Sequence, residues 1–127
     1  MVDKQIITFG GLRPSRGRTH PLINYVLSLP RKDHPKVCFI PTATGDAATS
    51  IVAFYDRFNS SNAESSHLSL FNRTVYNIEE YLLSHDIIMV GGGNTANMLA
   101  TWRVHGVDVA LEKAWNSGVI MCFFFLS

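Results

Sequence analysis

Three glycines followed by two polar residues, Gly91 to Thr95, have the residue types best suited to chemistry in this sequence. The segment follows the apolar run Asp86 to Val90 and precedes a stretch with helical spacing. Glycines let backbone N–H groups approach a ligand closely, and Asn94 or Thr95 could cap a helix whose dipole favours negative charge. The segment therefore predicts a place for an anion or a developing oxyanion. A tight strand-to-helix turn without a ligand is the alternative interpretation.

The same segment fits the loose dinucleotide-binding pattern if Ala96 takes the place of the last glycine. That pattern requires an acidic residue about twenty positions further on, at the end of a second strand. Glu112 lies instead on a predicted helix, and no lysine follows the glycines as a P-loop requires. The sequence therefore gives nucleotide binding little support.

Polar side chains also follow the first two predicted strands. They are Arg13, Arg16 and Arg18 after the first strand, and Thr42 and Thr44 after the second. The arginines could bind a substrate carboxylate through paired hydrogen bonds, or they could form a solvated loop. Because ligands bind outside the carboxyl ends of parallel strands, we expect the two hydroxyls at the same edge as the glycines. Asp46 is expected to cap the helix that follows.

The histidines and cysteines show no spacing typical of a metal site. His34 and Cys38 would lie about 13 Å apart along one strand, which is too far to share an ion. His85 is expected at the end of a helix. Cys38 and Cys122 both lie in apolar runs, where a free cysteine behaves as a small hydrophobe. The sequence predicts no metal and no cofactor, and the free thiols indicate a reducing cytoplasm.

The chain has 127 residues, a net charge of +1 and 46% hydrophobic residues, which predicts one soluble domain over residues 1–127. Its basic residues are scattered, so neither nucleic acid nor an anionic membrane is predicted as a partner. The N-terminal residues have no signal-peptide pattern. The longest apolar run, Val119 to Leu126, has eight residues and is too short to span a bilayer.

Strand and helix patterns alternate along the chain. Apolar runs predict strands at 4–10, 36–41, 66–71, 86–90 and 119–126. Apolar residues at helical spacing predict helices at 21–29, 46–59, 77–85, 95–103 and 107–117. Such alternation implies right-handed crossovers, so the fold class is α/β, an open three-layer α/β/α sandwich with a mostly parallel sheet.

The segment from Ile87 to Cys122, IIMVGGGNTANMLATWRVHGVDVALEKAWNSGVIMC, closely resembles peptidase family S51, the dipeptidase E and cyanophycinase group, in particular its bacterial cytoplasmic branch. The likeness extends upstream to HPLINYVLSL, KVCFIPTATGD and IVAFYDRF, so it covers most of the chain from His20 onward. Members of that family resemble the glutamine-amidotransferase-like α/β sandwich. They are serine hydrolases that cleave small peptides without a cofactor. The resemblance implies this fold, this activity and a small peptide as substrate.

The resemblance also implies roles for the glycine loop. In the family the GGGNT loop lies beside the active site and is expected to give a backbone N–H to the oxyanion hole. Here the matching residues are Gly91, Gly92 and Gly93, with Asn94 and Thr95 shaping the turn. Donors preset where charge develops can lower a barrier by about 3–4 kcal/mol each.

The family's nucleophile is expected after the fifth strand, as Gly-x-Ser-Ala-Gly on a sharp elbow. Counting along CFFFLS puts Phe123 in the place of the first glycine and Phe125 in that of the serine. Ser127 is no substitute because no helix and no oxyanion donor follow it. The family's downstream histidine and acidic partner have no counterpart either. We therefore expect the N-terminal part of an S51-like serine peptidase, inactive as this chain, from a gene truncated by a frameshift or premature stop.

Two further hypotheses remain open at this stage. The first is a non-catalytic binding module that uses Gly91 to Thr95 for a carboxylate or phosphate, and the second is a remnant without a ligand. An incomplete domain would also expose apolar surface, which predicts poor solubility or a homo-oligomer.

Overall fold

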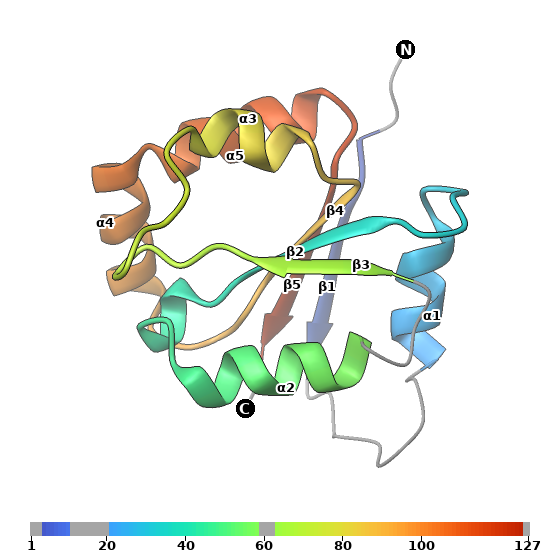
Figure 1. The fold of residues 1–127 in the computed structure, drawn as a ribbon, viewed down its shortest axis with the longest axis horizontal. Helices are drawn as coiled ribbons and strands as arrows, with labels where there is room; N and C mark the ends of the chain where they lie inside the picture. The colour runs from blue at the N-terminus through green and yellow to red at the C-terminus, as the bar shows by residue number, and fades with distance from the viewer. Residues whose placement is uncertain (1–3, 11–20, 59–62, 126–127) are drawn as a thin grey trace.

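Five parallel strands form the centre of the computed structural model, which describes residues 4–10, 21–58 and 63–125 (Figure 1). The order across the sheet is β1-β5-β4-β2-β3. The strands are β1 (Ile6–Gly10), β2 (Lys36–Ile40), β3 (Glu64–His67), β4 (Ile87–Val90) and β5 (Ile120–Phe125). Every neighbouring pair is parallel, which confirms the α/β class and the mostly parallel sheet.

Helices cover both faces of this sheet (Figure 1). They are α1 (Pro21–Ser28), α2 (Ala48–Phe58), α3 (Ile78–Leu83), α4 (Thr95–His105) and α5 (Val107–Asn116), with a short 3-10 helix η1 (Thr42–Thr44) after β2. Helices α1 and α2 pack on one face, and α3, α4 and α5 pack on the other. The predicted three-layer arrangement is therefore confirmed.

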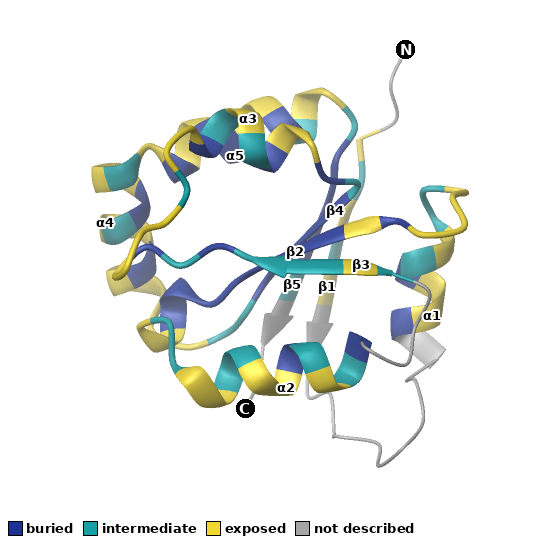
Figure 2. Ribbon diagram, viewed as in Figure 1, coloured by how far each residue is buried: buried dark blue, intermediate teal, exposed yellow. Residues whose placement is uncertain are grey.

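The central strands are buried on both sides, as their unbroken apolar sequences require (Figure 2). All four residues of β4 are buried and alternate between the two cores. Ile88 and Val90 point toward α4 and α5, whereas Ile87 and Met89 point toward α1 and α2. Side chains of β4 therefore pack against the helices on both faces of the sheet, and its last residue sets where the glycine loop begins.

The third strand lies earlier in the chain than the alternation over 66–71 predicts. β3 pairs with β2 through residues 64–67, and the chain then leaves the strand although Leu68 and Leu70 are buried. The backbone N–H groups of Leu70 and Phe71 donate to the carboxylate of Asp46 at 2.7 and 2.8 Å instead of to a strand. This long-range acceptor holds the chain after the strand, and the 66–71 prediction is correct only for residues 66 and 67.

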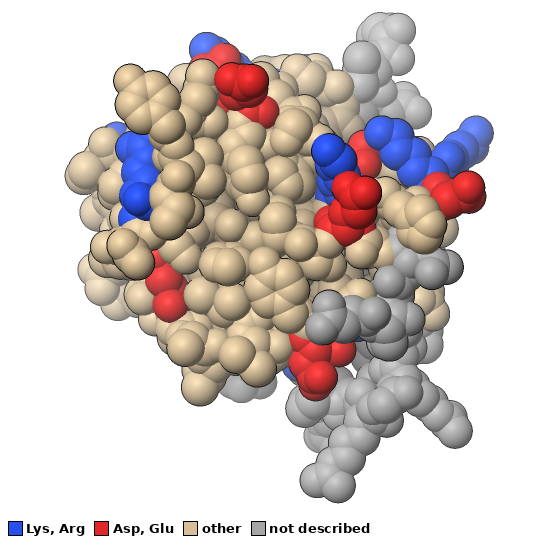
Figure 3. All heavy atoms as spheres, in the orientation of Figure 1, with Lys and Arg blue, Asp and Glu red and all other residues tan. Residues whose placement is uncertain are grey.

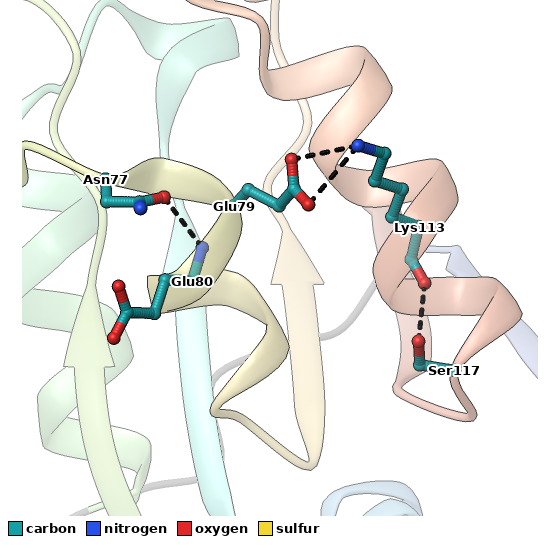
Figure 4. A network of polar contacts seen from close by, with 5 residues as sticks. All are labelled: Asn77, Glu79, Glu80, Lys113 and Ser117. Carbon is teal, nitrogen blue, oxygen red and sulfur yellow. Dashed lines mark hydrogen bonds and ion pairs between the residues drawn. The ribbon is translucent and has the colours of Figure 1, made fainter.

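A side-chain cap and an ion pair fix helix α3 at the surface. Asn77 caps helix α3 by accepting from the N–H of Glu80 with its side chain, and an ion pair of 3.1 Å joins Glu79 to Lys113 on α5 (Figure 4). Acidic and basic side chains form small separate groups on the face drawn in Figure 3. In the described part of the chain, no helix is long and apolar enough to cross a membrane.

The two cysteines lie on opposite faces of the sheet. Cys38 belongs to the core under α3 and α5, and Cys122 belongs to the core under α1. β4 separates their strands, and both thiols are free. Burial raises the pKa of each thiol to about 12, so both are unreactive structural residues.

Candidate active site

The glycine loop continues directly from β4 and is tied down at both ends. The N–H of Gly91 donates to the carbonyl of Ile40 at 3.2 Å, and the N–H of Asn94 donates to the carbonyl of Ala43 at 2.8 Å. Between these two anchors, the N–H groups of Gly92 and Gly93 donate to none of the described residues. The loop therefore presents two adjacent backbone donors that are available to a ligand.

Asn94 is the residue that caps helix α4. Its side-chain oxygen accepts from the N–H of Asn97 at 3.0 Å, and its backbone is extended. Thr95 is the first residue of the helix and is exposed. The N-terminus of α4, the positive end of its dipole, therefore follows the two glycine donors directly in the chain, and such a terminus favours a negative charge.

Glycine is required at two positions of the loop for different reasons. Gly93 has a φ of +151°, and a Cβ there would lie 2.6 Å from the carbonyl carbon of Ala43 and collide with its oxygen. A Cβ on Gly91 would lie 3.1 Å from two ring atoms of Phe39. A side chain at Gly93 would thus collide with backbone, and one at Gly91 would crowd an aromatic ring.

The threonines after β2 do not both face this edge as predicted. Thr42 is buried, and its hydroxyl accepts from the indole N–H of Trp102 at 3.0 Å. Thr44 is exposed, and its hydroxyl donates to the carbonyl of Pro41 at 3.0 Å. The expectation is therefore wrong for Thr42, because the core under α4 takes up its hydroxyl.

Asp46 does not cap helix α2. Its backbone has a φ of +57°, and its Oδ2 accepts from the N–H groups of Leu70 and Phe71. The prediction of a cap is wrong because the carboxylate accepts from these two N–H groups of the segment after β3 instead of from the first turn of α2. Asp46 joins the loops after β2 and β3 and so holds the loop that anchors Asn94.

A cavity of about 60 Å³ opens beside the glycine loop, between β2 and α2. The rings of Phe39, Phe54 and Phe58 form its apolar wall, and Arg57 lines it together with the backbone of Gly91 and Gly92. No sequence pattern singled out Arg57, because its place on the helix face that meets Phe39 depends on how α2 packs. The cavity and the two free donors together form one candidate site.

Other residues considered in the sequence do not add to this candidate site among the described residues. Arg13, Arg16 and Arg18 fall outside the described residues. His34 is exposed between α1 and β2, at the opposite end of β2 from the glycine loop. Among the described residues, no group of three or more His, Cys, Asp or Glu side chains could hold a metal ion.

His85 lies at the end of α3 as predicted, but its burial could not be foreseen. Its Nδ1–H donates to the carbonyl of Tyr81 at 2.7 Å, so its Nε2 accepts from the hydroxyl of Ser66 at 2.8 Å. Burial lowers the pKa of His85 below its ordinary value. These groups hold α3 against the edge strand, away from the glycine loop.

A parallel α/β sheet with free backbone donors after a central strand defines a class of proteins that bind ligands at the carboxyl edge of the sheet. The comparison with known families is specific: the model of peptidase family S51 matches residues 6–122. The chain belongs to peptidase family S51.

Two relatives agree with this assignment. The chain is 39% identical over 119 residues to the uncharacterized peptidase YgaJ of Bacillus subtilis (strain 168), covering 93% of this chain and 52% of that protein. A crystal structure from Listeria monocytogenes EGD-e, of a protein named for peptidase E, matches with a TM-score of 0.67 at 23% identity. That match covers 83% of this chain and 52% of the other, and it shows the same fold. The chain thus spans about half the length of both relatives.

Proposed function

We propose that this chain supplies the oxyanion-binding and substrate-binding half of a serine peptidase that hydrolyses small peptides. The observation that carries the proposal is the pair of N–H groups on Gly92 and Gly93, which have no acceptor among the described residues. They lie at the N-terminus of α4, where the helix dipole adds to their attraction for negative charge.

The register of the sheet supports this role. β4 pairs with β5, and Val90 stands opposite Phe123, so the chain that continues β5 emerges next to the glycine loop. In the family this chain resembles, the nucleophile follows that strand. A serine there would attack the peptide carbonyl, and negative charge would develop on the carbonyl oxygen. Gly92 and Gly93 would donate to that oxygen, and each preset donor lowers such a barrier by about 3–4 kcal/mol.

We propose in addition that residues 1–127 bind a peptide without cleaving it. The residues after Cys122 read FFFLS, with phenylalanine where the family pattern has its serine. A phenyl ring cannot attack a carbonyl. The binding groups and the attacking group therefore belong to different parts of the family's sequence.

Two measurements on the purified 127-residue chain test both proposals. Titration with short dipeptides, followed by amide NMR, is expected to shift the Gly92 and Gly93 resonances saturably. The chain is expected to release no amino acids and to remain unlabelled by a fluorophosphonate, a serine-directed probe. Turnover, or labelling at Ser127, would overturn the inactivity. Shifts with inorganic phosphate but with no dipeptide would overturn the peptidase role in favour of a simple anion site.

We also infer a cytoplasmic location, since Cys38 and Cys122 are both buried free thiols of the kind found in reducing compartments. Fractionation of the source cells, followed by immunodetection, tests this directly. Recovery in the secreted fraction would refute it.

A further inference from the structure

The cavity between β2 and α2 has the size of one amino-acid side chain. It measures about 60 Å³, and one water needs about 10–15 Å³ of such space, so it holds about four to six water-sized atoms. The side chains of leucine, isoleucine and methionine each have four non-hydrogen atoms. Gly91 and Gly92 line it, so an occupant would lie next to Gly92, which carries one of the two free backbone donors, and one residue from Gly93, which carries the other.

The wall of the cavity is apolar and rigid. The ring of Phe54 stacks on Phe39 at 4.8 Å between centroids and packs against Phe58 at 4.7 Å. All three side chains are buried in the core between α2 and the sheet. These three rings gain by contact with apolar carbon, while Thr44 and Ser50 supply the uncharged polar side chains of the lining.

One charge adjoins this apolar space. Arg57 on α2 is partly buried and is the one charged residue among the described residues that line the cavity. It forms no ion pair with the described residues, whose ion pairs are Lys32 with Asp86 and Lys113 with Glu79. A guanidinium group binds a carboxylate through paired hydrogen bonds. The cavity therefore combines space for an apolar side chain with a cation suited to a carboxylate.

We propose that this cavity is a specificity subsite for the C-terminal residue of a short peptide. It takes a side chain of leucine, isoleucine or methionine size, and Arg57 pairs with the free carboxylate of the same residue. The inference rests on the proposed function, because the peptide bond before that residue would then lie at Gly92 and Gly93. Phe39 lines the cavity, and its ring leaves no free space for a side chain at Gly91.

The test measures binding of three small probes to the full chain by NMR titration: acetyl-leucine, acetyl-leucine amide and acetyl-glycine. Each buried methylene contributes about fourfold in affinity, so acetyl-leucine is expected to bind at least tenfold more tightly than acetyl-glycine. Acetyl-leucine amide is expected to bind several-fold more weakly than the acid. Equal affinities for the leucine and glycine probes would overturn the subsite.

Variants on α2 locate the binding. Ala53 is exposed and lines the cavity, so Ala53→Phe is expected to fill it and weaken acetyl-leucine at least tenfold, with Ala53→Leu as a smaller substitute. Ala48 is exposed on the same helix but does not line the cavity, so Ala48→Phe is the matched control and should bind normally. Arg57→Gln should remove the preference for the acid over the amide. A preference that persists in Arg57→Gln would refute the carboxylate contact.

The two proposals can fail separately. If Ala53→Phe abolishes binding of acetyl-leucine while dipeptides leave the Gly92 and Gly93 amides unshifted, the subsite stands and the oxyanion role fails. If dipeptides shift those amides equally in Ala53→Phe and in the unmodified chain, the oxyanion role stands and the subsite is wrong.

Discussion

Replacing Gly93 with alanine isolates the steric constraint that shapes the candidate site. Two separate costs are expected. The backbone φ of +151° lies in a region that is sparsely populated without glycine, which costs about 1–3 kcal/mol. The added Cβ would also collide with the carbonyl group of Ala43, which accepts the N–H of Asn94. Breaking that hydrogen bond costs about 0.5–1.5 kcal/mol.

Gly106 supplies the matched control, since it also has a positive φ, of +73°, but a Cβ there meets nothing within 4 Å. Gly106→Ala should therefore show the conformational cost alone, about 1–2 kcal/mol. Gly93→Ala should lower the free energy of unfolding by about 1.5–4.5 kcal/mol, the sum of its two costs, and by more than Gly106→Ala does. A domain of this length has a stability of about 5–15 kcal/mol, so both variants should still fold.

Urea unfolding followed by tryptophan fluorescence measures both free energies, with an unchanged m-value as the check that unfolding remains two-state. Gly93→Ala should also shift the amide resonance of Asn94, whereas Gly106→Ala should leave it in place. If the two variants are equally stable within about 0.5 kcal/mol, the collision with Ala43 does not shape the loop and the reasoning is refuted.

Three further predictions concern the contacts that hold the loops and helices. Asp46→Ala should lower the free energy of unfolding by about 2–3 kcal/mol, because the buried N–H of Leu70 and its neighbour lose a charged acceptor. The free energy of unfolding should fall as pH drops below 6.5, the ordinary pKa of His85, because burial lowers the folded-state pKa and the unfolded chain binds the proton first. Lys113→Ala should change the free energy of unfolding by less than about 0.5 kcal/mol, because its ion pair with Glu79 is exposed.

Each of these has an outcome in the same unfolding assay that would contradict it. Asp46→Asn keeps an amide oxygen as acceptor and should lose less stability than Asp46→Ala, and equal losses would contradict the hydrogen-bond argument. His85→Gln should flatten the dependence on pH between about 5 and 7, and an unchanged slope would assign it to other groups. A loss above about 1 kcal/mol in Lys113→Ala would show that the pair between α3 and α5 is stronger than its exposure implies.

The features that could be predicted from the sequence depend on short stretches of chain. The strand that ends at Val90 and the glycine loop after it are defined by an apolar run followed directly by glycines, and both lie where predicted. The alternation of strands and helices likewise predicts the parallel sheet, because only crossovers of one hand connect such elements. Even within the loop, the structure is needed to assign the cap to Asn94 instead of Thr95.

The features that could not be predicted depend on partners far apart in the chain. Asp46 has the residue type and position of a helix cap, but donors 24 and 25 residues away take its carboxylate. His85 is bound by Ser66, which is 19 residues earlier on the edge strand. Arg57 lines the cavity only because α2 packs across Phe39. Local patterns carry no information about these pairings, since they follow from the register of the sheet and the packing of helices on it.

The position of the two free donors follows from these long-range contacts. Gly92 and Gly93 stand between two N–H groups that are already bound, one to Ile40 and one to Ala43, so both ends of the segment that carries the donors are held. The accepting carbonyls are themselves fixed, because β2 holds Ile40 and the buried 3-10 turn holds Ala43. Donors fixed in advance need no reorganisation when charge develops, which is the condition under which such groups stabilise an oxyanion most. Under the proposed function, contacts with no part in the chemistry would thus hold the two donors in place for a negative charge at this edge of the sheet.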